Sequence, residues 1–108
     1  NEQYDYFFII LENNDIIGCC ILTTVTEQII KLRQMAIHPN YQRKNIGKSL
    51  IQYCEKFAFK QNYQQIVLHA RETALGFYKK NGYAAIGDFF IEVSIPHIKM
   101  FKNIQFEN

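Results

Sequence analysis

The fold of this chain is decided by one polar stretch, HPNYQRKNIGKSL, which occupies residues 38–50. It follows a run of alternating apolar residues and precedes apolar residues at helical spacing, so it joins a strand to a helix. The first turn of a helix offers unpaired backbone N–H groups and about half a positive charge. A loop that wraps over that turn can aim further N–H groups at one point and bind an anion. The stretch therefore predicts a strand–loop–helix unit suited to a phosphate group.

The residue types in this stretch fit that interpretation. Gly47 is small enough for the backbone to approach a phosphate, and Asn45 is the next best residue where φ is positive. Arg43, Lys44 and Lys48 add positive charge for a diphosphate or a ribose phosphate. The Walker A pattern is absent, because no second glycine precedes the GKS sequence at the required distance. By spacing alone, a plain connection between two elements is the commoner explanation of such a loop.

Alternating and β-branched residues predict three strands before this stretch, at residues 4–11, 16–26 and 28–37. In the third strand the alternation places two sets of side chains on opposite faces, namely Ile30, Leu32, Gln34 and Ala36 against Ile29, Lys31, Arg33, Met35 and Ile37. The elements expected after the stretch are a helix at 48–60, a strand at 65–70, a helix at 73–80 and strands at 83–95 and 97–102. Asn81-Gly82 ends the second helix, and Pro96 separates the last two strands. The order β-β-β-α-β-α-β-β predicts a mixed α/β fold in a single domain, residues 1–108.

Composition narrows the class of protein further. The chain has 108 residues, 48% of them hydrophobic, and a net charge of +2, which excludes a disordered chain. Its pI of about 8.5 and its interrupted basic residues do not give the field of a nucleic-acid binder, so no nucleic-acid partner is expected. No apolar run has the length of a membrane span, and no membrane partner is expected. Three cysteines without CxxC spacing are typical of small apolar residues in a reducing compartment, which predicts a cytoplasmic protein with no metal.

Two segments at the proper separation resemble the signatures of the GNAT superfamily of N-acetyltransferases. The stretch YQRKNIGKSLI is similar to the pyrophosphate loop Gln/Arg-x-x-Gly-x-Gly/Ala, with Gln42 first, Gly47 last and Asn45 where the middle glycine is usual. The segment ETALGFYKKNGY resembles the second signature, Ala-x-x-Phe-Tyr-x-Lys-x-Gly-Phe/Tyr, and the ending IPHIKM resembles a subgroup of small bacterial members. The resemblance implies a central, mostly antiparallel sheet flanked by helices. It also implies that a first strand and a helix pair, usual before residues 4–11, are absent here.

The resemblance implies that acetyl-CoA is the co-substrate. Its pantetheine arm would pair with the backbone of the third strand, and its pyrophosphate would be held by the loop. One backbone amide would also polarise the thioester carbonyl. The residues implied in binding are Met35, Ala36, Ile37, Gln42, Arg43, Lys44, Asn45, Ile46, Gly47 and Lys48.

The implied reaction is direct attack of a primary amine on the thioester, which needs a proton acceptor for the amine and a donor for the thiolate. Tyr78 occupies the position of the family's usual acid. Many members carry a glutamate near position 33, where this chain has Arg33, so Glu92 and His97 are the candidates for the base. His38 is interpreted as a positional residue of the loop, and His69 as a core histidine with a satisfied hydrogen bond.

Two classes of function remain open at this point. The leading one is an acetyl-CoA-dependent N-acetyltransferase that acts on a small-molecule amine, with a homodimer as a possible assembly. The alternative is a catalytically silent module that binds CoA or a protein, which the replacement at Arg33 and the short N-terminal end favour.

Overall fold

The computed structural model describes residues 3–42 and 45–104 of the chain, so Arg43 and Lys44 of the loop lie outside the described residues. The elements are β1 (Asp5–Glu12), β2 (Asp15–Thr24), β3 (Ile29–Ile37), η1 (Pro39–Tyr41), α1 (Ile46–Lys60), β4 (Gln65–Arg71), η2 (Glu72–Ala74), α2 (Leu75–Lys80), β5 (Ala84–Glu92) and β6 (Ile95–Asn103). Their order confirms the predicted one, with two short 3-10 turns added. One of these turns, η2, takes the first residues of the predicted second helix, so α2 is short.

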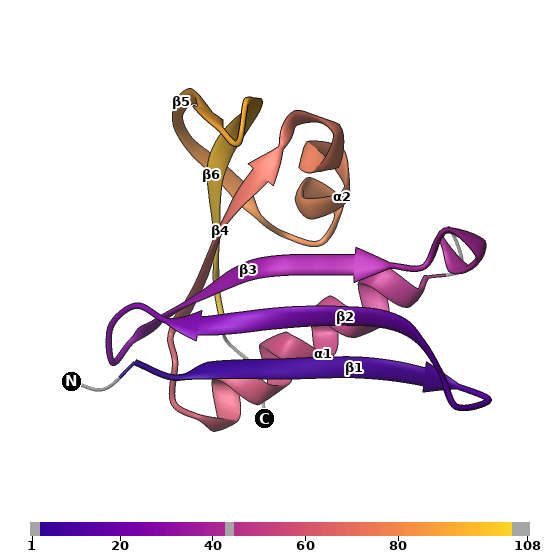
Figure 1. Ribbon diagram of the computed structural model, residues 1–108. Helices are drawn as coiled ribbons and strands as arrows, with labels where there is room; N and C mark the ends of the chain where they lie inside the picture. Colours follow the sequence, from indigo (N-terminus) through magenta and orange to yellow (C-terminus); the bar gives the residue numbers. More distant parts are fainter. Residues whose placement is uncertain (1–2, 43–44, 105–108) are drawn as a thin grey trace.

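All six strands form one mixed sheet in the order β1-β2-β3-β4-β6-β5. The pair β3–β4 is parallel and the other neighbours are antiparallel, which confirms the expected, mostly antiparallel sheet. The parallel pair needs a crossover connection, and α1 supplies it after the polar loop. Figure 1 shows β3 and β4 leaving a shared start and diverging toward their carboxyl ends.

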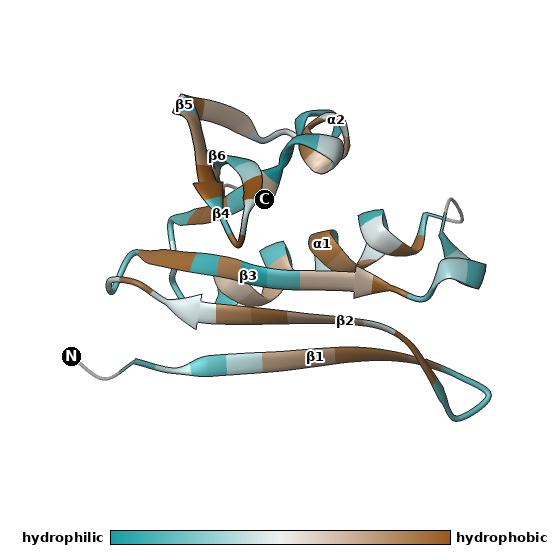
Figure 2. Ribbon diagram, turned by 45° about the horizontal axis from the view of Figure 1, so that its top comes forward, coloured by the Kyte–Doolittle hydropathy of each residue, from teal (hydrophilic) through white to brown (hydrophobic). Residues whose placement is uncertain are grey.

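Both helices pack on the same face of the sheet, which we call the helix face. Leu50, Ile51 and Cys54 of α1 and Tyr78 of α2 belong to one core cluster with the buried side chains of the strands. Phe7 and Ile9 of β1 point to the opposite side, the outer face, where they are exposed. No helix of the described residues covers that outer face, and Figure 2 shows apolar colouring along β1 and β2.

A β-bulge at Arg33 changes the predicted faces of β3. Ile21 pairs with Gln34 and Leu22 with Leu32, so Arg33 is an extra residue opposite β2. Strict alternation beyond it was therefore wrong. The side chains on the helix face are Ile30, Leu32, Met35 and Ile37, and those on the outer face are Lys31, Gln34 and Ala36.

Pro96 does not separate the last two strands, contrary to expectation. The break is the tight turn Val93-Ser94, where both residues have positive φ, 51° and 61°. Pro96 pairs with Ile91 of β5, while the ladder to β4 ends one residue later, at His97. The proline therefore has a strand neighbour on one side only, where its missing N–H is tolerated.

A buried ion pair joins α1 to the far end of the sheet. Glu55 of α1 is 5% exposed, and both its carboxylate oxygens lie 3.1 Å from Lys102 Nζ of β6. The Tyr83 hydroxyl donates to the same carboxylate at 2.9 Å, and Lys102 also donates to the carbonyl of Asn81 at 2.9 Å. These contacts fix the turn that follows α2, so they hold that helix in place on the sheet.

Candidate functional site

The site is an opening between β3 and β4. Their parallel ladder runs from Ile29–Gln65 to Leu32–Leu68 and stops there, although both strands continue beyond it. The strands diverge from that point and leave a cavity of about 770 Å³. The backbone of β3 beyond Leu32 therefore has no strand partner on the β4 side among the described residues.

Five of the predicted site residues line this opening, namely Met35, Ala36, Tyr78, Glu92 and His97. The other predicted residues within the described part of the chain lie at the adjoining loop or the start of α1, namely Ile37, Gln42, Asn45, Ile46, Gly47 and Lys48. Residues that are far apart in the sequence thus line the same opening in the sheet.

The loop ends in a helix start with free donors. Asn45 has a φ of 61°, the left-handed conformation expected for it, and its side chain makes no capping hydrogen bond. The first turn of α1 holds no acidic residue. Ser49 N bonds to Asn45 O, so the N–H groups of Ile46, Gly47 and Lys48 are those that the helix leaves unpaired.

A glycine is needed at position 47 because neighbouring side chains leave little room for a Cβ atom there. Its φ is not among the positive ones, so left-handed backbone is not the reason for a glycine here. A Cβ at this position would lie 3.3 Å from the Phe77 ring and 3.9 Å from Met35 Cε. The start of α1 therefore packs against α2 and β3, directly beside the opening and on the helix face.

The loop before α1 is held by short local bonds. His38 N donates to the carbonyl of Ile17 at 2.8 Å, and His38 Nδ1 accepts from Asn40 N at 3.1 Å. The Gln42 side-chain amide donates to the carbonyl of Ile37 at 3.2 Å. The positional role expected for His38 is thus confirmed, since its ring fixes the turn.

Tyr78 reaches the opening from the helix face. The residue is 9% exposed, and burial, with smaller effects from Cys20 and Cys54, raises the pKa of its hydroxyl to about 12. The Tyr78 hydroxyl makes no hydrogen bond among the described residues. Every fully buried side-chain oxygen of those residues has a hydrogen-bond partner, so this hydroxyl is not fully buried. The hydroxyl therefore opens onto the free space of the cavity, protonated at neutral pH.

On the outer face a carboxylate lies between two imidazoles. Glu92 Oε1 is 3.0 Å from His69 Nδ1, and Glu92 Oε2 is 3.7 Å from His97 Nε2. The hydrogen bond from His69 lowers the pKa of Glu92, so this carboxyl is ionised at neutral pH. Phe90 stacks on His97 with ring centroids 6.1 Å apart and contacts His69 edge-on at 4.9 Å.

The tautomer of His97 follows from its other contact. Its Nδ1 lies 2.7 Å from the carbonyl of Ile95, which only accepts, so Nδ1 carries the hydrogen. In the neutral ring Nε2 then holds a free lone pair, with the Glu92 carboxylate ready to balance a proton gained there. The arrangement can accept a proton on the outer face while Tyr78 offers one from the helix face.

His69 was misinterpreted from the sequence. It is a half-buried residue that lines the opening and bonds to Glu92, not a core histidine. The alternation in β4 contained the signal, because Ile66 and Leu68 face the helices and His69 falls between such positions.

Two buried thiols lie behind the site. Cys20 Sγ of β2 and Cys54 Sγ of α1 are 3.0 Å apart, whereas Cys19 faces the other side of β2 and is half-buried. This confirms that the adjacent cysteines point to opposite faces. No group of His, Cys, Asp and Glu within residues 3–42 and 45–104 could hold a metal ion.

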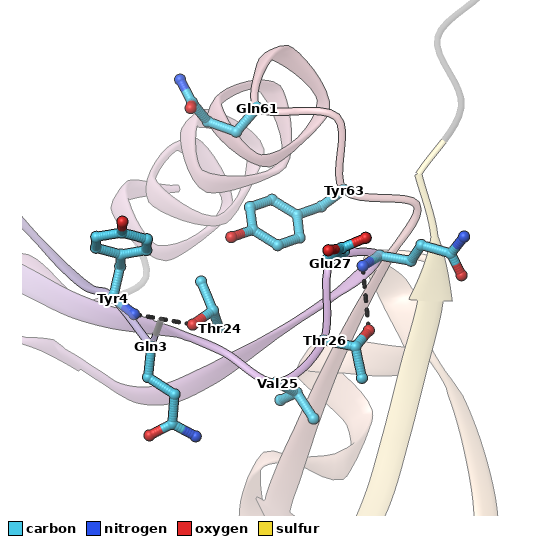
Figure 3. A pocket seen from close by; sticks show the side chains of 9 residues that line it. Gln3, Tyr4, Thr24, Val25, Thr26, Glu27, Gln61 and Tyr63 are labelled. Atoms are coloured by element: carbon cyan, nitrogen blue, oxygen red, sulfur yellow. Dashed lines mark hydrogen bonds between the residues drawn. The ribbon is translucent and has the colours of Figure 1, made fainter. Parts of the chain in front are cut away.

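A second hollow, of about 820 Å³, lies at the opposite end of the meander. Figure 3 shows the rings of Tyr4 and Tyr63 directed into it, with Thr24 and Gln61 around them. Glu27 is the one charged side chain of its lining in the described part of the chain. Its described lining has no histidine and only that one carboxylate, and it includes Gln61 at the opposite end of α1 from the helix start. Across the described ranges, none of the helices has the length and apolar character that spanning a membrane requires.

Comparison with known proteins gives this site its context. Residues 3–85 match the family described as "Acetyltransferase (GNAT) domain". The chain therefore belongs to the GNAT acetyltransferase family, as its two signatures predicted.

Individual relatives are similar over part of their length. An acetyltransferase of Bacillus subtilis (strain 168) is 32% identical over 72 residues, which is 67% of this chain and 49% of that protein. The glucosamine 6-phosphate N-acetyltransferase of Schizosaccharomyces pombe is 34% identical over 56 residues, 52% of this chain and 50% of that one. The chain thus spans about half the length of these relatives.

A solved structure shares the fold. The aminoglycoside 6'-N-acetyltransferase complexed with coenzyme A superposes with a TM-score of 0.84 at 16% identity, over 96% of this chain and 75% of that one. The predicted GNAT-like fold is confirmed by this likeness.

Proposed function

We propose that this chain transfers an acetyl group from acetyl-CoA to a primary amine, by direct attack of the amine on the thioester. The observation that carries the proposal is the opening where the β3–β4 ladder stops, with proton-handling groups on its two faces. Family membership supports it, and so does the fold shared with an acetyltransferase that was solved with coenzyme A.

The cofactor approaches from the helix face. The unpaired N–H groups of Ile46, Gly47 and Lys48 hold the pyrophosphate at the start of α1, beside Met35. The pantetheine arm bonds to the backbone of Met35, Ala36 and Ile37, which pairs with β2 and, among the described residues, has no strand partner on the β4 side. Gln42 and Asn45 flank the phosphates from the described part of the loop, and positive charge from Arg43 and Lys44 is proposed from the sequence alone.

The amine approaches from the outer face and arrives as an ammonium ion. His97 Nε2 takes its proton, and the Glu92 carboxylate balances the resulting imidazolium. The amine nitrogen then bonds to the thioester carbon, the carbon–sulfur bond breaks, and the nitrogen releases its second proton to solvent to give the neutral amide. His69 holds Glu92 in position through its 3.0 Å hydrogen bond.

Tyr78 donates a hydrogen bond to the leaving thiolate. Its hydroxyl faces the cavity from the side of the cofactor and stays protonated, since its pKa is about 12. A thiol has a pKa of about 8.5, so complete transfer of the phenolic proton is uphill. Tyr78 therefore stabilises the thiolate as a strong hydrogen-bond donor, and solvent completes the protonation.

Thiol release from acetyl-CoA with a panel of primary amines tests the proposal. We expect release with at least one amine, and a fall of about 100-fold or more for His97→Gln, the range for loss of a general base. Glu92→Gln should lower kcat, whereas Glu27→Gln, in the distant hollow, should not. CoA binding by calorimetry without transfer to any amine would instead support the silent CoA-binding module. A cytoplasmic location, a single domain and a homodimer remain proposals that rest on the sequence.

A further inference from the structure

The two faces of the opening serve different molecules. The start of α1 and Tyr78 lie on the helix face, where the cofactor phosphates are held in the proposed function. His69, Glu92 and Phe90 lie together on the outer face. The charges that an acceptor amine meets are therefore those of the outer side.

Cations outnumber carboxylates there. Lys31, Arg33 and Arg71 line the opening, and Glu92 is the one carboxylate among its described lining residues. Glu92 is already bonded to His69. The Arg33 guanidinium has a loose partner, Asp5, at 4.0 Å, with both side chains about half exposed at 50% and 44%.

The other two cations are not held in ion pairs among the described residues. In the part of the chain that the structure describes, neither Lys31 nor Arg71 has a carboxylate oxygen within 4.0 Å. Lys31 Nζ lies 3.5 Å from His69 Nδ1, which already donates its hydrogen to Glu92. Lys31 is close enough to Glu92 to help lower the pKa of that carboxyl, but it is not paired with it, and it lines the opening on the side of β3 where the bulge also leaves Arg33.

We propose that the preferred acceptor is a primary amine that also carries an anionic group, a carboxylate or a phosphate. Its amine lies at Glu92 and His97, and its anionic group lies between Lys31, Arg33 and Arg71. An acceptor with further amino groups is disfavoured, because its additional positive charges meet these three side chains without a free carboxylate to hold them. The proposal rests on the acetyl transfer proposed above and names its substrate class.

Matched pairs of amines give the test, with thiol release measured on the full chain. Glucosamine 6-phosphate is compared with glucosamine, β-alanine with β-alaninamide, and putrescine represents the dications. We expect kcat/KM to be about tenfold or more higher for an anionic member, the fold-change expected of one charged hydrogen bond, with the difference mainly in KM. The phosphate and carboxylate pairs distinguish the two sources of the anion.

Variants separate a specific contact from a general charge effect. Lys31→Gln and Arg33→Gln should each lower the preference several-fold, whereas Lys56→Gln, an exposed position on α1, should leave it unchanged. Raised salt should reduce kcat/KM for the anionic amine more than for its neutral partner. Turnover of the neutral or dicationic amines alone, or a preference that both variants preserve, would overturn this proposal only. Absence of transfer to every amine would refute the proposed function, and this proposal with it.

Discussion

The change Tyr78→Phe separates a catalytic hydroxyl from a structural one. It keeps the ring and its contacts with Phe77 and Tyr83, whose centroids lie 5.1 and 5.7 Å away. It removes only the hydroxyl, which has no hydrogen-bond partner among the described residues. The variant should therefore fold like the parent chain.

The structure sets the size of the two expected effects. Since no hydrogen bond is lost in the resting protein, the free energy of unfolding should change by less than about 1 kcal/mol. A hydrogen bond to a charged sulfur contributes about 1.5–3 kcal/mol, so kcat should fall by about 10- to 150-fold. Because the pKa of Tyr78 is about 12, its hydroxyl should cause no loss of kcat up to about pH 10.

The assay combines thiol release, urea unfolding and calorimetric titration of CoA. The matched control is Tyr83→Phe, the same chemical change at a buried hydroxyl that donates to Glu55 at 2.9 Å. This control should lose about 1–3 kcal/mol of stability and keep the kcat of its folded fraction. CoA affinity should stay the same in both variants.

Two results would refute the reasoning about Tyr78. An unchanged kcat would remove the residue from the reaction. A loss of stability as large as that of Tyr83→Phe would mean that the hydroxyl has a structural partner after all.

Three further predictions concern the groups that support the site. Lys102→Met leaves the Glu55 carboxylate buried without its cation, so unfolding in urea should show a loss of about 3–5 kcal/mol, much of which the double change with Glu55→Leu should restore. Asn45→Val forces a β-branched residue into left-handed backbone, so it should lower the free energy of unfolding by about 1–2 kcal/mol and weaken CoA binding. Asn45→Gly should keep the parent stability and the parent CoA affinity. Equal losses in the two variants would refute the role of φ. The pKa of Glu92 is lower in the folded protein than its ordinary value of 4.5, so the ionised carboxylate stabilises the fold above pH 4.5. This contribution disappears as the pH falls through the lowered pKa of the folded state. The urea midpoint of the parent chain should therefore decline more steeply below pH 4.5 than that of Glu92→Gln. Parallel curves would show that the His69 contact is absent in solution.

Local patterns predicted the elements and the loop well, because each depends on neighbouring residues. The apolar spacing of α1 and the left-handed Asn45 follow from residue type and sequence alone. Ladder positions were harder. Strict alternation failed after Arg33, since nothing in the sequence of β3 marks the residue that lacks a partner on β2.

The outer half of the site depends on strand pairing. Glu92 and His69 meet because β6 lies between their strands and a hairpin turns at Val93-Ser94. The sequence named Glu92 and His97 as candidates, but it could not join them to His69 without the order of the sheet. The sequence also could not predict that Lys31, Arg33 and Arg71 line the opening, because their positions depend on the bulge and on the divergence of β3 and β4.

The bulge at Arg33 also bears on how such a sheet tolerates change over evolution. Deletion of a single codon there would remove the bulge and place Gln34 directly after Leu32, so regular alternation would keep Met35 and Ile37 on the helix face and Gln34 and Ala36 on the outer face. A missense change at the same position leaves the register intact. Natural variation at this point of the strand should therefore include single-residue deletions as well as replacements, because both leave the same side chains on the helix face.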